Sequence, residues 1–432
     1  MSKGEARNQA EPNRNKRSII EPIRNNRNFR LLWISNLFFF GGAWTQTLVL
    51  GWIVYTTTNS AFSLALFTAV RLAPLLLGPF GGLLSDRFDR VRLLMVACVW
   101  TLVAVSIVAA MATAGMTPFW ALVLGGLAIG LAQSPSQPAR SSLVFEMVGR
   151  ENLSQANALN SMALNMTQVV GPALGGAMIS AVGAPMTLWI STAWYAISLV
   201  ALLPLRSLKR SRQVHSQSAL RMLMGGFRIV LSNRLTRAVL MVTLAANVLI
   251  WPIYQSFMPV FAVDVLHLNA AGLGWLLTCS GVGGLTGALI IASLGDFEHK
   301  GGLFILGTAT WAFLWFLFGL SHHSATSFIL MIGIGLMSAS FGVLQTTLLL
   351  MTTDSQVQGQ ALGMQELAIG IMPLSALAIG AIASQIGVGL TTQGSALLLV
   401  LTMVILAMQV PELLHYSGTE SAQTQVSDAQ SV

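Results

Sequence analysis

Twelve long apolar runs follow one another along this chain, and they decide what it can fold into. A helix needs about 20 mostly apolar residues to cross a lipid bilayer. Only 9% of the residues are charged, whereas soluble domains carry about 25%. The sequence therefore predicts an all-α membrane protein with twelve transmembrane helices. The runs lie near residues 31–55, 61–84, 93–113, 118–138, 155–182, 186–204, 238–262, 271–294, 302–320, 325–349, 361–386 and 391–410.

Lysine and arginine are confined to alternate connections between these runs. With the N-terminus in the cytoplasm, 22 of the 23 basic residues fall in cytoplasmic segments, if Arg140 is counted in the connection after the fourth run. The remaining one, Arg71, lies within the second run. By the positive-inside rule, both termini are expected to be cytoplasmic. The net charge of +8 is then a topology signal, so the lipid bilayer is an expected partner and nucleic acid is not.

The longest polar stretch between runs divides the chain into two bundles of six helices. Within it, the apolar residues from Leu220 to Leu231 recur at helical spacing, which predicts a short helix on the membrane surface. The part before Ser218 fits a solvated linker equally well. The predicted domains are an N-terminal tail (1–30), a first bundle (31–204), a cytoplasmic linker (205–237), a second bundle (238–410) and a C-terminal tail (411–432).

The two bundles also resemble each other in sequence. "GGAMISAVG" (175–183) matches "IGAIASQIG" (379–387) in the corresponding run of the second bundle. Chance similarity between helices rich in glycine and alanine is the alternative. Parallel six-helix repeats about a pseudo-two-fold axis, with a binding site between them, are typical of secondary transporters. The coinciding pairs are Gly176/Gly380, Ala177/Ala381, Ser180/Ser384 and Gly183/Gly387.

Charge is concentrated in "GGLLSDRFDRVRLL" (81–94), after the second run. This stretch resembles the signature loop of the major facilitator superfamily, and the resemblance implies that superfamily's fold. It also implies a latch that joins the two halves on the cytoplasmic side in the outward-open state. An exposed loop that only orients the protein explains the arginines, but not the spacing of glycine and aspartate. The matching residues are Gly82, Asp86, Arg87 and Arg90, with Arg92 as a further cation and Asp89 where many members have glycine.

A second motif, "VVGPALGG" (169–176), resembles the fifth-span motif of exporters in this superfamily. Its residues are Gly171, Pro172, Gly175 and Gly176. Proline removes a backbone hydrogen bond and glycine removes side-chain bulk, which predicts a kinked, closely packed helix. The resemblance implies a hinge that also seals against proton leak, and ordinary tight packing is the alternative.

Three longer phrases are similar to the bacterial branch that includes enterobactin exporters and macrolide-efflux permeases. They are "SPSQPARSSLVFEMVGRENLSQANALNS" (134–161), "GGFRIVLSNRLTRAVL" (225–240) and "MPVFAVDVLHLNAAGLGWLL" (258–277). The resemblance covers nearly all of residues 28–410. It implies a bacterial inner-membrane protein that exports an organic molecule, and it leaves the substrate open.

Two ionisable residues lie well inside predicted spans, and such residues are functional hypotheses by default. Arg71 either binds an anionic group of the substrate or caps carbonyls next to Pro74. Glu366 either carries a proton, since burial favours a neutral carboxyl group, or pairs with loop arginines. The fourth span, "WALVLGGLAIGLAQS", contains no charge, so the arginine motif that many proton-coupled members carry there is absent.

The resemblance implies that spans 1, 4, 7 and 10 line a central cavity. Neutral hydrogen-bonding groups beside large aromatic rings suit a bulky amphipathic ligand. Interfacial anchoring explains some aromatic residues near membrane surfaces, but not Trp44 and Trp251 in mid-span. Together with Arg71, the candidate cavity residues are Asn36, Trp44, Gln46, Gln133, Asn247, Trp251, Tyr254, Gln255 and Gln345.

These features predict an efflux transporter that works by alternating access, with proton antiport expected. The expected substrate is a siderophore-like or drug-like small molecule. An importer or lipid-moving protein of the same fold, and a scaffold or sensor that does not transport, are the alternatives. We expect no enzyme activity, metal or cofactor, because the sequence suggests no catalytic or ligating cluster. Cys98 and Cys279 lie in apolar runs and are expected to pack there.

Overall fold

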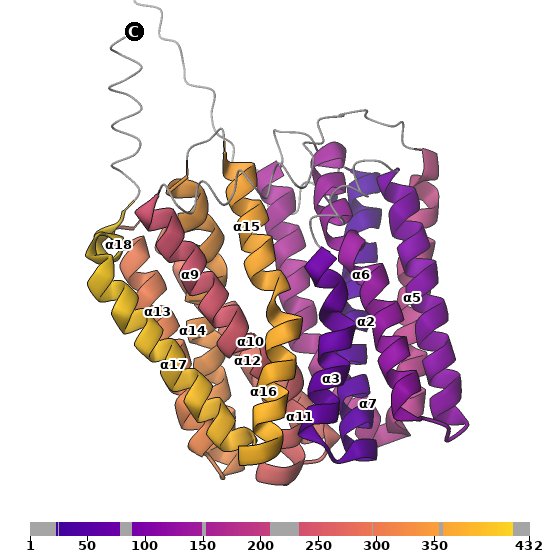
Figure 1. Ribbon diagram of the computed structural model, residues 1–432. Coiled ribbons are helices and arrows are strands. Elements are labelled where there is room, and N and C mark those ends of the chain that lie inside the picture. Colours follow the sequence, from indigo (N-terminus) through magenta and orange to yellow (C-terminus); the bar gives the residue numbers. More distant parts are fainter. Residues whose placement is uncertain are drawn as a thin grey trace, which may run out of the picture.

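In the computed structural model, the described residues are 23–24, 26–77, 89–148, 153–207, 233–295, 297–353 and 357–417. They form long helices that run side by side across one bundle (Figure 1). Most of the predicted linker (205–237) lies outside them, and so do Gly82, Asp86 and Arg87 of the signature loop.

The first half of the chain supplies α2 (Arg27–Thr58), α3 (Ala61–Leu72), the 3₁₀ segment η1 (Ala73–Leu77), α5 (Arg90–Thr113), α6 (Phe119–Val148), α7 (Leu153–Leu202) and η2 (Leu203–Ser207). The long α7 reverses at Gly183, the one residue within it whose backbone is not helical. The reversal follows from two contacts with α2: Asn160 bonds Asn36, and Ser198 bonds Ser35. Two membrane-crossing segments are therefore joined at Gly183, as the apolar runs predicted.

The second half begins with α9 (Arg234–Leu249), α10 (Trp251–Ser256), α11 (Met258–Val260) and the π-helical η3 (Phe261–Val265). The remaining helices are α12 (Ala270–Ser293), α13 (Lys300–Leu320), α14 (Ser324–Met351), α15 (Gln358–Gly370), α16 (Met372–Ile386), α17 (Val388–Gln409) and α18 (Pro411–His415). Two predicted runs, 238–262 and 361–386, are broken into shorter helices. Pro252, Pro259 and Pro373 begin the new segments, because proline cannot donate to the preceding turn.

Ten helical segments in the described part of the chain are long and apolar enough to cross a membrane, and Ala61–Leu76 is a shorter apolar helix. One of the ten, Leu159–Leu205, includes the reversal at Gly183 and so contains two crossings. The helices therefore agree with the twelve apolar runs.

The two ends of the bundle differ in charge. We call the end where α2, α5, α9 and α13 begin the basic end, and the opposite end the turn end. The described lysines and arginines lie at the basic end, apart from Arg71 and Arg140. In Figure 1 the basic end is at the top.

The internal repeat has a direct structural counterpart. Gly183 (φ 83°, ψ 161°) and Gly387 (φ 85°, ψ 156°) adopt the same left-handed backbone at the turn end. Gly176 lies against α12, where an added Cβ would come within 2.4 Å of a backbone oxygen. Its repeat partner Gly380 lies against α3, where an added Cβ would come within 2.3 Å of the Ala65 Cβ. The halves thus meet along two equivalent helix pairs, α7 with α12 and α16 with α3.

Candidate functional site

Arg140 is the main correction to the sequence analysis. The positive-inside count places Arg140 in a connection, and the fourth apolar run is expected to hold no charge. In the structure its side chain is only 1% exposed, inside α6. That prediction is wrong because α6 continues to Val148, well beyond the apolar run. The Arg140 guanidinium donates to Ser35 Oγ at 3.1 Å and to Asn36 Oδ1, and it lies 4.3 Å from the ring centre of Phe39.

A polar cluster surrounds Arg140 inside the first half. Ser35 and Ser198 are hydrogen-bonded at 2.8 Å, and Asn36 Nδ2 donates to Asn160 Oδ1 at 2.7 Å. Cys98 accepts from Arg140 at 3.7 Å. In the described part of the chain no carboxylate contacts Arg140, and its Nε has no acceptor. Serine and asparagine in the first apolar run were the sequence signal for this cluster, and only Asn36 was singled out.

Arg71 is also buried, at 6% exposure, in the last turn of α3. Its guanidinium donates to Thr47 Oγ1 at 2.9 Å, and Nε has no described acceptor. Among described residues the side chain bonds no backbone carbonyl, so the capping alternative finds no support there. Gly130 of α6 allows this close packing, since a Cβ on it would lie 1.9 Å from the Arg71 carbonyl oxygen.

Two predicted cavity residues gather beside Arg71 around a tyrosine that sequence reasoning missed. The fully buried Tyr195 donates to Gln46 Oε1 at 2.6 Å and also interacts with Gln133 and Arg71. We call Arg71, Gln46, Gln133 and Tyr195 the Arg71 cluster. It draws on spans 1, 2, 4 and 6, so it belongs to the first half alone.

The second half contains a row of aromatic rings on α10 and α13. Trp251 lies 5.8 Å from Tyr254 and 6.0 Å from Trp311, and Tyr254 lies 6.4 Å from Trp315 (ring centres). The Nε1 atoms of Trp311 and Trp315 are buried without a described acceptor. We call these four residues the aromatic ladder; the two from α13 were not predicted.

The other predicted cavity residues are placed individually. Trp44 is half-buried, and its Cβ is close to Gly171. Asn247 donates to the carbonyl of Thr243 within its own helix at 2.8 Å. Gln255 is half-buried, and Gln345 has a buried Oε1 without a described donor.

The described part of the signature motif splits into two faces of α5. Arg90 forms an ion pair with Glu146 at the end of α6. Arg92, two residues further, is rotated by about 200° around the helix and lies on the outer face of the first half. Arg92 thus lies on a different face of α5 from Arg90, and its part in the latch stays a prediction. Asp89, which departs from the motif, caps α5 by accepting from the Arg92 backbone N–H at 3.0 Å.

The fifth-span motif packs α7 against α2 of its own half and α12 of the second half. The Gly171 carbonyl accepts from Thr45 Oγ1 at 3.0 Å, and Gly175 also faces Thr45. On the other side, a Cβ on Gly274 of α12 would lie 2.6 Å from the carbonyl oxygen of Pro172. The backbone stays helical through Pro172. Close approach to α12 is thus what these small residues permit.

Glu366 is exposed in α15, about 12 Å along the helix from Gln358. It lies one turn before Gly370, which faces Leu75 of η1, so both residues are on the side turned toward the first half. The neighbouring Gln365 points elsewhere and donates to Thr346 at 2.8 Å. The structure therefore leaves the Glu366 side chain exposed, one helical turn from the contact between Gly370 and η1.

A contact between the halves occurs at the turn end. Tyr55 near the end of α2 donates to the carboxylate of Asp264 in η3. These residues belong to different repeats, so the bond connects the two bundles.

A family model described as a transmembrane secretion effector matches residues 17–428. The chain belongs to this family. It is similar to the multidrug efflux pump Tap of Mycobacterium tuberculosis, with 30% identity over 61% of this chain and 65% of Tap. It therefore spans somewhat less than two thirds of that relative.

Two further comparisons agree with the fold and the predicted branch. The enterobactin exporter EntS of Shigella flexneri is 28% identical over 77% of this chain and 81% of EntS. A crystal structure of the peptide transporter POT has a TM-score of 0.74 at 13% identity, covering 90% of this chain and 95% of that one. The protein is therefore a multi-pass membrane protein of the transmembrane secretion effector family, with the major facilitator fold.

Proposed function

We propose that this protein exports a drug-like or siderophore-like organic molecule from the cytoplasm by alternating access, in exchange for protons. The observation that carries the proposal is the symmetric contact between its halves. Gly176 and Gly380 allow α7 to approach α12 and α16 to approach α3 at equivalent positions. Rigid halves that meet along equivalent helix pairs can rock about a central site.

The proposed substrate class follows from the polar and aromatic side chains that each half contains. The Arg71 cluster offers a buried cation with two glutamines and a tyrosine hydroxyl, and no described carboxylate neutralises it. An uncompensated buried charge is costly, so an anionic ligand group would be bound favourably there. In the aromatic ladder, Trp251 and Tyr254 are half-buried and offer ring surface, and the buried Trp311 and Trp315 support them. The substrate we propose is an amphipathic aromatic anion.

The membrane orientation we propose follows from charge. The basic end faces the cytoplasm of a bacterial cell, and the turn end faces outward. In this orientation the Tyr55–Asp264 bond closes the outer side, while Arg90–Glu146 stabilises the cytoplasmic side of the first half. Glu366 is the carboxylate proposed to exchange protons, because its side chain is exposed one turn from the contact between α15 and η1.

Everted membrane vesicles test direction and charge together. The probes are fluorescein, an aromatic anion, and ethidium, an aromatic cation, each added outside energised vesicles. We expect accumulation of fluorescein, and a loss of about tenfold in Arg71→Gln, because one charge-assisted hydrogen-bonding group is removed. Arg71→Lys, which retains the charge, should lose less. Accumulation of ethidium alone would exclude the anionic class, and loss of preloaded fluorescein would indicate an importer.

A further inference from the structure

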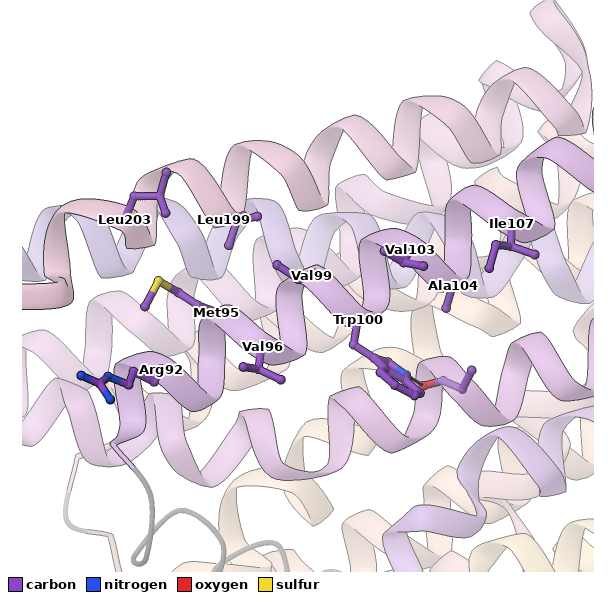
Figure 2. Close-up of a pocket in the computed structure, with 11 residues that line it drawn as sticks. Arg92, Met95, Val96, Val99, Trp100, Val103, Ala104, Ile107, Leu199 and Leu203 are labelled. Carbon is purple, nitrogen blue, oxygen red and sulfur yellow. Dashed lines mark hydrogen bonds between the residues drawn. The ribbon is translucent and has the colours of Figure 1, made fainter.

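An apolar groove of about 710 Å³ runs along the outer face of the first half, away from the second half. Its floor is α5, and its walls include Ala128 of α6 with Leu199 and Leu203 of the last part of α7 and η2. Figure 2 shows Arg92 at one end of the row of lining side chains and Ile107 at the other. In a membrane-spanning bundle this face meets lipid.

The groove is apolar along its length and cationic at one end. Val96, Val99 and Val103 of α5 are between 46% and 63% exposed. Trp100 is 52% exposed, yet its indole N–H is satisfied by the Ala128 carbonyl at 2.8 Å. Arg92 is the one charged lining residue, and its guanidinium bonds no described residue.

The dimensions suit one lipid in one leaflet. From Arg92 to Ile107 the helix rises about 22 Å, whereas the hydrocarbon core of one leaflet is about 15 Å thick. An acyl chain can therefore lie along the valines while its headgroup stays level with Arg92. Arg92 lies in the first turn of α5 at the basic end, where a headgroup phosphate would meet it. A guanidinium forms bidentate hydrogen bonds with a phosphate.

We propose that this groove binds an anionic phospholipid, with an acyl chain along Val96, Val99 and Val103 and the headgroup phosphate on Arg92. The Arg92 guanidinium explains why an anionic headgroup is preferred, and the row of valines explains where the acyl chain binds. Binding here is independent of the transported substrate, because the groove lies on the side of α5 remote from the Arg71 cluster.

Trp100 provides a local reporter for the experiment. The full-length protein is reconstituted with increasing fractions of phosphatidylglycerol or phosphatidylcholine carrying brominated acyl chains, which quench tryptophan fluorescence on contact. The Trp100 signal is the difference between the wild type and Trp100→Phe. We expect half-maximal quenching at a phosphatidylglycerol fraction about fivefold lower than for phosphatidylcholine, the size of effect expected for one cation near an anionic headgroup.

Two matched variants decide the role of Arg92. Arg92→Gln should abolish the preference for phosphatidylglycerol, while Arg30→Gln should keep it. Arg30 is also an exposed arginine at the start of a helix at the basic end, but it lies outside the groove. Equal quenching by both lipids in the wild type would show that the groove contacts lipid without selecting an anionic headgroup. Quenching by neither would mean that protein covers it, and a preference that survives Arg92→Gln would place the anion elsewhere; each result overturns the proposal.

Discussion

Tyr55 and Asp264 join the two halves of the protein across the turn end, with the tyrosine hydroxyl donating to the carboxylate. Tyr55 is buried, whereas Asp264 is exposed. Alternating access requires the halves to separate at each end in turn. Under the proposed mechanism this bond has to break whenever the turn end opens, so its strength contributes to the balance between the two states.

Removing that bond should favour opening of the turn end. For Tyr55→Phe we expect a shift of about 1 kcal/mol toward the open state, the usual size for a partly exposed hydrogen bond. Spin labels on cysteines at Thr56 and His322, exposed positions at the turn end of each half, should report a larger population of long distances by pulsed electron resonance. An unchanged distance distribution would remove the bond from the gating equilibrium.

Glycines at the two equivalent helix pairs should be intolerant of a methyl group. Gly176→Ala and Gly380→Ala each place a Cβ within 2.4 Å of the opposing half, so the halves must separate or shift. We expect both variants to insert normally and to transport at less than about a tenth of the wild-type rate, since overpacking costs about 1–3 kcal/mol. Gly394→Ala, which meets nothing within 4 Å, is the control. Equal activity in all three variants would contradict the symmetric contact.

Exchanging the charges of the Arg90–Glu146 pair should restore transport that either single reversal impairs. Its side chains are 21% and 30% exposed, so the pair is partly shielded from water. Arg90→Glu and Glu146→Arg should each reduce transport about tenfold by like-charge repulsion. The double variant should recover most of the loss. A double variant that is as poor as the worse single one would show that the two positions act separately.

Arg140 should matter for stability. Replacing it with alanine removes the contact with Phe39 and leaves the Ser35 and Asn36 oxygens without their donor. We expect a loss of about 2–4 kcal/mol, because buried polar groups without partners are costly. Thermal denaturation in detergent measures this, and Arg30→Gln, an exposed change, should leave the midpoint within about 1 °C.

Glu366 can be tested by separating proton movement from substrate exchange. If Glu366 exchanges the proton, Glu366→Gln should abolish substrate-driven pH change in reconstituted vesicles while fluorescein counterflow persists, because the neutral side chain removes only the ion step. If Glu366 instead pairs with loop arginines, both activities should fall together. Glu298→Gln changes an exposed carboxylate at the basic end and is the matched control. Undiminished proton coupling in Glu366→Gln would exclude the carrier role.

Much of this architecture could be predicted from the order of apolar and small residues along the sequence. The apolar runs predicted the crossings, and the repeat of Gly176 and Gly183 by Gly380 and Gly387 predicted the equivalent contacts, because length and side-chain size act locally along a helix. Proline also marks where α10, α11 and α16 begin. Family membership followed from motifs that are contiguous in sequence.

Tertiary structure decided the environment of the charges. From the sequence, Arg140 is assigned to a connection. In the structure it is surrounded by Ser35, Asn36 and Phe39, which are more than 100 positions away in the chain. Glu366 lies in an apolar helix, yet its side chain is exposed. Arg90 and Arg92 are neighbours in sequence but lie on opposite sides of α5. The free energy of a charge in a membrane protein depends on which groups face it, and those groups come from other helices.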